Sequence, residues 1–383
     1  MPKQIEEIQI LRFIAAFIVV LDHCSFVGSL MAARHNVPFH LPMFPGRLGV
    51  DIFFIISGFI MVYISSSGER WTITPVDFFR NRWVRIVPIY LVATALYVAL
   101  YFLSGNFGRW SPLQYLTTIL FIPYFDDVSK LPFPILSQGW TLCFEMFFYA
   151  IFAISLSFSR RAAPLFLGIV FVSLVAVGAI WNLASGSVFV LTPMHLKVDF
   201  IVPRFWMHPI ILEFLAGIFL AILRERLLER GELWPFRFRI STCIVIVAAY
   251  VVLSNLTDSL NPVPSLIRFC CALSVVAICV FTVDESKKTS LHPIFVFLGG
   301  CSYSLYLFHT HVIFVMDSVW KRLGLFSAIG AFVLVGALVS VLLSVVAYQL
   351  LEVRIIRFFR SMRPKISVAT PAPTPTTVVS VPE

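Results

Sequence analysis

One apolar stretch near the start of the chain holds an arginine and a histidine eleven residues apart. In ILRFIAAFIVVLDHCSF, residues 10–26, these are Arg12 and His23. Eleven residues nearly complete three helical turns, so a helix carries both side chains on one face, about 16 Å apart along its axis. Imidazole gains and loses a proton near neutral pH and can act as a general base. The spacing predicts a helix that links a cation near one membrane surface to a base in the opposite half of the bilayer.

Both residues also have a purely structural interpretation. Arg12 suits an interfacial arginine whose charged end reaches water, and His23 suits a histidine hydrogen-bonded inside a helix bundle. Because ionisable side chains are expensive at membrane depth, we favour a functional role for His23. Both interpretations of Arg12 stay open.

Two further apolar stretches carry acidic and hydroxyl side chains. GVDIFFIISGFIM places Asp51 near the outer end of its span and Ser57 next to Gly58 near mid-membrane. GWTLCFEMFFY places Glu145 about five residues inside another span. A carboxylate at that depth has to face the bundle interior and find a partner there. The structural alternatives are small-residue helix packing at Gly58 and a structural hydrogen bond at Glu145.

A polar stripe follows in GGCSYSLYLFHTHVIFV. Ser302, Tyr306 and His309 are spaced i, i+4, i+7 and therefore share one helix face. If this span enters from the cytoplasm, His309 lies in the outer half of the bilayer, as His23 does. The histidines and the seven cysteines show no metal-ligand spacing, so we predict no metal site.

A basic cluster opens the stretch DFFRNRWVRIVPIYL. It contains Arg80, Arg82 and Arg85, and the last two are neighbours on one helix face. Two guanidinium groups on one face suit a phosphate-rich ligand, because each can bind phosphate through two parallel hydrogen bonds. The alternative is ordinary enrichment of cytoplasmic loops in basic residues, or contact with lipid headgroups.

The composition identifies the class of protein. The 383 residues are 59% hydrophobic and only 13% charged, whereas soluble domains carry roughly a quarter charged residues. We therefore predict an all-α, polytopic membrane helix bundle. The net charge of +9 is explained by basic loops beside anionic membrane lipids. We therefore predict no nucleic-acid partner.

About ten apolar stretches are long enough to cross a bilayer. They lie near residues 9–27, 48–66, 84–104, 140–158, 163–182, 208–224, 239–255, 264–282, 292–316 and 326–350. With a cytoplasmic N-terminus, 20 of the 29 Lys and Arg residues face the cytoplasm, so we predict that both termini lie there. One transmembrane domain covers 1–360, and the Pro- and Thr-rich segment 361–383 is predicted to be a disordered cytoplasmic tail. Outer loops near 105–139 and 183–207 are long enough to cover a site.

Taken together, these motifs resemble acyltransferase family 3, the polytopic enzymes that O-acylate extracytoplasmic glycans. The matching segments are spread in order along the chain: Arg12 with His23, FFIISGF (Phe53–Phe59), RNRWVRIVPIY (Arg80–Tyr90), WTLCFEMFFY (Trp140–Tyr149) and SYSLYLFHTH (Ser302–His311). The start IQILR and the WTLCFEMFFY segment look most like the branch that acetylates exopolysaccharide. Cys143 departs from the pattern, at a position where a small hydroxylated residue is expected.

The resemblance implies a function and a role for each motif. Acetyl-CoA would be the co-substrate, and Arg12, Arg82 and Arg85, with Arg80 beside them, would hold its phosphates at the cytoplasmic mouth. The pantetheine arm would rise through a continuous pore to His23, the general base. Glu145 would orient His23 or bind a sugar hydroxyl. The remaining candidates would line the substrate and acyl pocket: Asp51, Ser57, Ser302, Tyr306 and His309.

The same resemblance implies an acceptor and a location. The acceptor would be exopolysaccharide or its lipid-linked precursor, and the enzyme a multi-pass protein of the bacterial inner membrane. The reaction needs an oxyanion donor, for which Tyr306, Ser57 and Ser302 are the candidates. A covalent acyl-enzyme on Ser57 is the competing mechanism. The rival functions are a transporter or flippase of a glycan or small anion, and a non-catalytic relative that only binds glycan or lipid.

Overall fold

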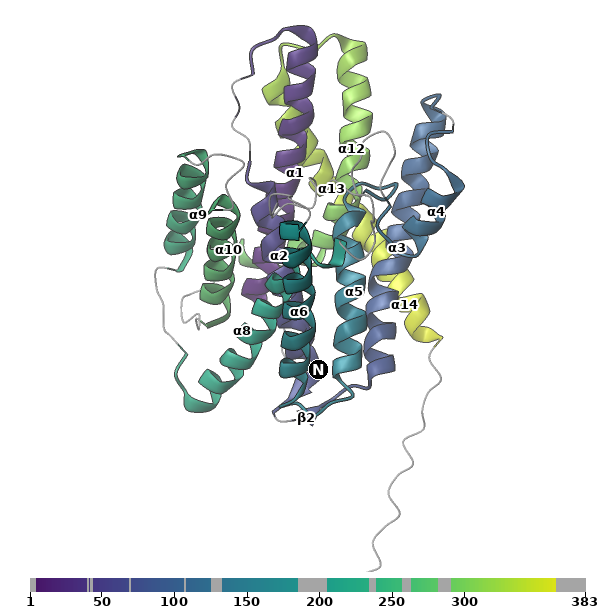
Figure 1. Ribbon diagram of the computed structural model, residues 1–383. Coiled ribbons are helices and arrows are strands. Elements are labelled where there is room, and N and C mark those ends of the chain that lie inside the picture. Colours follow the sequence, from purple (N-terminus) through teal and green to yellow (C-terminus); the bar gives the residue numbers. More distant parts are fainter. Residues whose placement is uncertain are drawn as a thin grey trace, which may run out of the picture.

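The computed structural model is a bundle of helices (Figure 1). It describes residues 5–39, 41, 44–68, 70–106, 108–124, 133–184, 205–233, 239–256, 263–281 and 291–362. In chain order the helices are α1 (Glu6–His35), α2 (Gly46–Ser65), α3 (Pro75–Leu103), α4 (Pro112–Ile119), α5 (Gly139–Ser155), α6 (Ala163–Ala184), α8 (Ile211–Arg230), α9 (Arg239–Leu256), α10 (Val263–Phe281), α11 (His292–Gly300), α12 (Ser302–Leu323), α13 (Ile329–Ala347), the π-helical turn η2 (Tyr348–Glu352) and α14 (Val353–Ser361). A short antiparallel hairpin joins α2 to α3. Its strands, β1 (Ser66–Ser67) and β2 (Arg70–Trp71), have two residues each.

The helical membrane fold predicted from composition is confirmed. Within the described residues, five helical segments are long and apolar enough to cross a bilayer: Glu6–His35, Gly46–Ser65, Pro75–Leu103, Ala163–Trp181 and Ile329–Ser361. Three shorter apolar helices accompany them: Gly139–Ser155, Ser241–Leu253 and Ser265–Phe281. Each of the ten predicted stretches contains a helical segment, and 292–316 is divided between α11 and α12, but ten crossings stay a prediction.

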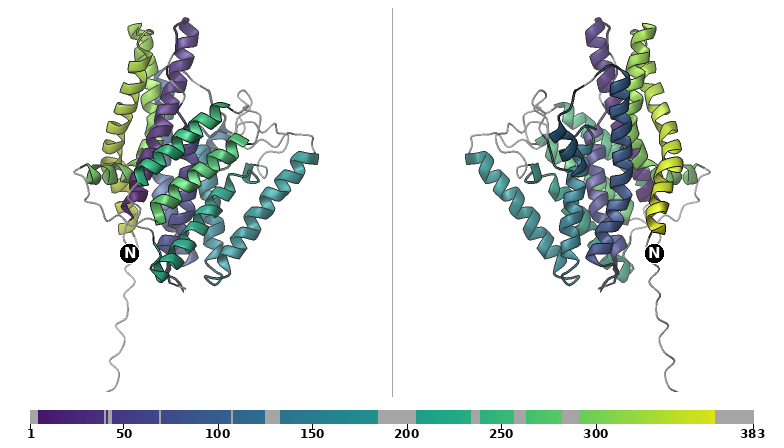
Figure 2. Two further views of the ribbon diagram at one scale, coloured as in Figure 1. Left: turned by 90° about the vertical axis from the view of Figure 1, so that its left-hand side faces the viewer. Right: turned by 90° about the vertical axis from the view of Figure 1, so that its right-hand side faces the viewer.

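The start of α1 and the end of α14 lie at the same end of the bundle, called here the inner end (Figures 1 and 2). The compartment that this end faces stays a prediction. Residues 363–383 of the predicted tail, and 125–132 and 185–204 of the predicted outer loops, lie outside the described residues.

Two glycines set the crossing of α2 and α8. A Cβ atom on Gly217 would overlap the carbonyl of Ile55, and one on Gly58 would overlap the carbonyl of Phe214. Small residues let helix backbones approach this closely. Gly58 therefore serves helix packing, the structural alternative for this residue. Its neighbour Ser57, about 100° around the helix, faces away from this crossing.

The long helix α1 runs beside α12 and α13, and all three extend past the other helices at the outer end (Figures 1 and 2). Next to α1, α2 begins level with Asp22, because a Cβ on Gly46 would touch the Asp22 side chain. Lower down, Gly49 lies against the backbone carbonyl of Ala15. The Arg12–His23 segment of α1 is thus enclosed by α2 on one side and by α12 on another.

Candidate active site

A cavity of about 980 Å³ lies between α1, α2, α3, α5, α12, η2 and α14. This is at the upper end of the usual range for small-molecule sites. It reaches the surface at the inner end, where the exposed side chains of Arg357 and Arg360 line it. Most of the predicted site residues also line it: Arg12, Ser57, Arg82, Arg85, Glu145, Ser302 and Tyr306.

Arginines dominate the inner part of this cavity. Arg82 is buried, with its guanidinium 5.7 Å from the centre of the Phe78 ring and 5.8 Å from that of Tyr149. Arg82 and Arg85 face the cavity together, as their spacing predicts. Arg357 and Arg360, which also line the cavity, were not among the residues predicted for the site. Their spacing of three residues, shared with the first pair, was a usable signal for a second phosphate-binding pair.

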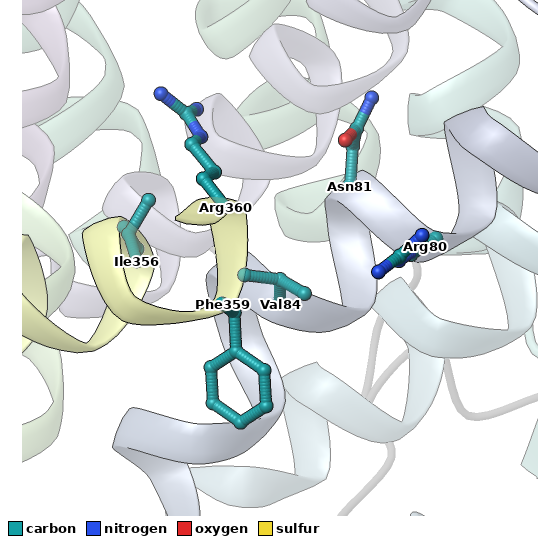
Figure 3. A pocket seen from close by; sticks show the side chains of 6 residues that line it. All are labelled: Arg80, Asn81, Val84, Ile356, Phe359 and Arg360. Carbon is teal, nitrogen blue, oxygen red and sulfur yellow. The ribbon is translucent and has the colours of Figure 1, made fainter. Parts of the chain in front are cut away.

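Arg80 is not part of this cavity, contrary to the prediction that grouped it with Arg82. It is exposed and lines a shallow crevice between α3 and α14, together with Asn81, Val84, Ile356, Phe359 and Arg360 (Figure 3). The reason is helical geometry, since two residues rotate a side chain by about 200°. Arg80 therefore points to a different side of α3 than Arg82.

Two carboxylates face the arginines inside the cavity. Glu145 accepts a hydrogen bond of 2.5 Å from the Ser57 hydroxyl, so it does not orient His23 in this structure. Glu352, which sequence reasoning missed, is buried and accepts a hydrogen bond of 2.6 Å from Ser304. It belongs to η2, and π-helical turns are frequent at functional sites. In the sequence, Glu352 ends an apolar stretch (LLE), as acidic residues at ordinary helix ends also do. No sequence pattern therefore marks it as a site residue.

His23 and His309 form a direct pair between α1 and α12. Their rings stack with centroids 5.0 Å apart, and His23 Nδ1 lies 2.8 Å from His309 Nε2. His309 Nδ1 lies 3.2 Å from the Leu305 carbonyl oxygen, which can only accept, so this nitrogen carries the proton. His309 Nε2 then accepts from His23 Nδ1–H. This leaves the lone pair of His23 on Nε2, as a general base requires.

The histidine pair does not line the cavity, and the predicted continuous pore is therefore interrupted. Tyr306 and Phe53 close its outer end, with ring centroids 6.0 Å apart. The Tyr306 ring lies 6.1 Å from that of His309 on the other side. Its hydroxyl is 2.9 Å from the Thr141 hydroxyl, which holds the tyrosine across the path. Tyr306 and Phe53 thus lie at the end of the cavity nearest to the histidine pair.

Asp51 lies outside the cavity, on the opposite side of α2, although it was predicted to line the substrate pocket. It accepts a hydrogen bond of 2.5 Å from Arg268 of α10, and both side chains are buried. The buried Glu213 of α8 interacts electrostatically with both. The structure therefore supports a packing role for Asp51, at the junction of α2, α8 and α10.

Replacing Arg268 with methionine is expected to lower the free energy of unfolding by about 3–5 kcal/mol, because Asp51 is left buried without its partner. The double variant Asp51→Asn, Arg268→Met should recover part of this loss, since it leaves no uncompensated charge on Asp51. Thermal unfolding in detergent measures both. An Arg268→Met protein as stable as the wild type would show that the ion pair does not hold these helices.

Comparison with known proteins identifies the family of this chain. Residues 5–349 match the sequence profile of the Acyl_transf_3 acyltransferase domain. The chain belongs to the acyltransferase 3 family. It is 33% identical to the exopolysaccharide production protein ExoZ of Rhizobium meliloti (strain 1021), over 83% of this chain and 92% of ExoZ. It is 23% identical to the acyltransferase MdmB of Streptomyces mycarofaciens, over 70% of this chain and 68% of MdmB. No solved structure matches the chain.

The family confirms the resemblance on which the predicted motifs were assembled. As a member of acyltransferase family 3, the chain is assigned to acyl transfer, and the arginine-lined cavity and the histidine pair are its candidate donor and base sites. The individual role of each residue is a proposal, developed below.

Proposed function

We propose that this protein transfers an acetyl group from cytoplasmic acetyl-CoA to a hydroxyl of an extracytoplasmic carbohydrate. The acceptor is exopolysaccharide or its lipid-linked precursor, and the site of action is the bacterial inner membrane. Membership of the acyltransferase 3 family and the similarity to ExoZ support the reaction and the acceptor class. The observation that carries the proposal is the order along the bundle, with Arg12, Arg82 and Arg85 lining the cavity and the His23–His309 pair beyond its outer end.

The charge of the cavity suits the donor. Its lining includes Arg12, Arg82, Arg85, Arg357 and Arg360, against the two carboxylates already described. The excess of positive charge complements the phosphates of CoA, and planar guanidinium groups bind phosphate in bidentate fashion. Glu352, which faces Arg85 and Arg12, keeps part of this charge balanced when no phosphate is bound.

The length of the donor also suits the site. About fourteen bonds separate the thioester carbon of acetyl-CoA from its first phosphorus, an extended reach of about 17 Å at roughly 1.2 Å per bond. Arg12 and His23 are about 16 Å apart along α1. A phosphate near Arg12 therefore brings the thioester level with the histidine pair once the Tyr306 side chain turns aside.

In the proposed reaction His23 Nε2 takes the proton of the acceptor hydroxyl. At the same time the oxygen of that hydroxyl attacks the thioester carbonyl carbon of acetyl-CoA. The C–S bond then breaks, and the imidazolium returns the proton to the CoA thiolate. The Tyr306 hydroxyl, at the end of the cavity next to His309, is the favoured oxyanion donor. The Ser57 hydroxyl already donates a hydrogen bond to Glu145 and is less suited to this task.

The competing route is an acyl-enzyme on Ser57. Its 2.5 Å hydrogen bond to Glu145 pairs a nucleophile with a base, which is the arrangement such a route requires. Brief mixing with acetyl-CoA in the absence of acceptor, followed by peptide mass analysis, separates the two. An acetylated Ser57 peptide would replace direct transfer by this route.

The proposed function is tested by mass analysis of surface polysaccharide made with and without the protein, together with transfer of labelled acetyl from acetyl-CoA in membrane vesicles. We expect a mass increase of one acetyl unit per modified sugar. Glycan or anion flux without acyl incorporation would instead favour the transporter or flippase alternative. CoA binding without any transfer would favour a non-catalytic relative.

Replacing Arg82 with methionine is expected to raise KM for acetyl-CoA by about 10- to 100-fold, because a charge-assisted contact to phosphate is lost. Thermal stabilisation by CoA should disappear in the same variant. Arg80→Met is the matched control, since Arg80 is two residues away and outside the cavity. Equal effects of the two substitutions would contradict the assignment of the donor site.

A further inference from the structure

Two buried polar atoms in the wall of the donor cavity have no hydrogen-bond partner among the described residues. They are the second carboxylate oxygen of Glu145, Oε2, and the hydroxyl of Ser302. The residues are 8% and 0% exposed, respectively, and both line the cavity. Buried polar groups are nearly always hydrogen-bonded, and leaving one unpaired is destabilising. Two such atoms in one cavity wall indicate polar groups on the molecule that binds there.

The helix register places these atoms at the same height on different walls. Gln138 bonds to Thr310, and Thr141 bonds to Tyr306, so α5 and α12 run in opposite directions. Glu145 follows Thr141 by four residues, and Ser302 precedes Tyr306 by four. Both therefore lie one helical turn, about 6 Å, to the inner side of the Thr141–Tyr306 hydrogen bond.

We propose that Glu145 and Ser302 bind an amide of the pantetheine arm of the donor. Glu145 Oε2 accepts from the amide N–H, and the Ser302 hydroxyl donates to the amide carbonyl. Ser57 supports the carboxylate through its 2.5 Å hydrogen bond to Oε1, which leaves Oε2 for the ligand. The Tyr149 hydroxyl also interacts with this carboxylate, and Arg82 and Arg12 lie near it, so Glu145 is in a positively charged part of the cavity. This inference rests on the proposed function, in which a CoA thioester is the donor.

The distance selects one of the two amides. Ser302 precedes His309 by seven residues, which is about 10 Å along α12. The nitrogen of the pantoate–β-alanine amide is about eight bonds from the thioester carbon, an extended reach of about 10 Å. The cysteamine amide is half as far and would lie beside Tyr306. The pantoate–β-alanine amide is therefore the one that Glu145 and Ser302 recognise.

The test compares acetyl-CoA with an analogue in which the N–H of the pantoate–β-alanine amide is replaced by an ester oxygen. For the wild type in membrane vesicles, we expect KM for the ester analogue to be raised about 10-fold or more, because Glu145 loses a donor and faces an ester oxygen. In Glu145→Gln the side-chain amide can donate to that oxygen, so the preference for acetyl-CoA should fall to within about 2-fold.

A second variant separates recognition from stability. Ser302→Ala removes a hydroxyl that has no hydrogen-bond partner in the described part of the chain, so the protein should unfold at the same or a higher temperature while KM for acetyl-CoA rises about 5- to 10-fold. Ser318→Ala, which removes an α12 hydroxyl that donates to the Phe314 carbonyl of its own helix, is the control and should change neither value. If Ser302→Ala does not fold, the donor preference of Glu145→Gln decides alone.

The outcomes distinguish this inference from the proposed function. Equal KM values of the wild type for acetyl-CoA and the ester analogue, or an unchanged preference in Glu145→Gln, would overturn the amide contact while leaving acetyl transfer intact. A wild type that binds no CoA and transfers no acetyl group would instead overturn the proposed function itself.

Discussion

Replacing His23 with asparagine is expected to reduce acetyl transfer by about 10²- to 10⁴-fold, the usual contribution of a general base. Asparagine places an amide N–H close to the position of imidazole Nδ1, so it can still donate to His309 Nε2. It has no atom that can accept a proton from the acceptor. The variant therefore keeps the contact between α1 and α12 but lacks the base.

The measurement is transfer of labelled acetyl from acetyl-CoA to polysaccharide in vesicles, with CoA-dependent thermal stabilisation recorded in parallel. Stabilisation by CoA should persist, because His23 does not line the donor cavity. His23→Ala should be equally inactive. Full activity of either variant would remove His23 from the chemistry and leave the pair with a structural role.

Replacing His309 with leucine is expected to lower kcat by about 10²- to 10⁴-fold with little change in KM for acetyl-CoA. His309 does not touch acetyl-CoA in our proposal, but it accepts a hydrogen bond from His23 Nδ1–H and so holds the base in the productive tautomer. Loss of a residue that orients a catalytic histidine has effects of this size in other enzymes. His309 thus acts as a positioning residue.

The glutamine variant distinguishes positioning from packing. In His309→Gln the side-chain oxygen lies near the position of imidazole Nε2 and can accept from His23 Nδ1–H. We expect kcat of His309→Gln to be at least 10-fold higher than that of His309→Leu. A factor of this size corresponds to the free energy of about one hydrogen bond. If leucine and glutamine reduce kcat equally, the pair does not set the tautomer of His23.

Local patterns in the sequence predicted which side chains share a helix face. Helical periodicity put Arg82 and Arg85 on one face, and Ser302 and Tyr306 on another, and all four line one cavity. The same periodicity could have separated Arg80 from Arg82, because two residues rotate a side chain by about 200°. That error came from treating the three arginines as one cluster by proximity in sequence.

The contacts between helices could not be predicted in this way. The partner of Glu145 is Ser57, 88 residues earlier in the chain, and the partner of Asp51 is Arg268, 217 residues later. Both acidic residues looked alike in sequence, as carboxylates in apolar stretches. Only packing shows that one faces the donor cavity and the other the junction of α2, α8 and α10.

The sequence by itself determined that this is a helical membrane protein of the acyltransferase 3 family, with Arg12 and His23 about three turns apart on one helix face. The fold class depends on composition and the shared face on spacing within one helix, whereas the family was given by the resemblance of the ordered motifs. The tertiary structure decided that His23 pairs with His309, that Tyr306 and Phe53 close the cavity below them, and that Glu352 joins its wall. Such contacts depend on how each helix is rotated against its neighbours. Close backbone crossings such as Gly58 with Gly217 set that rotation, and no pattern within one helix records it.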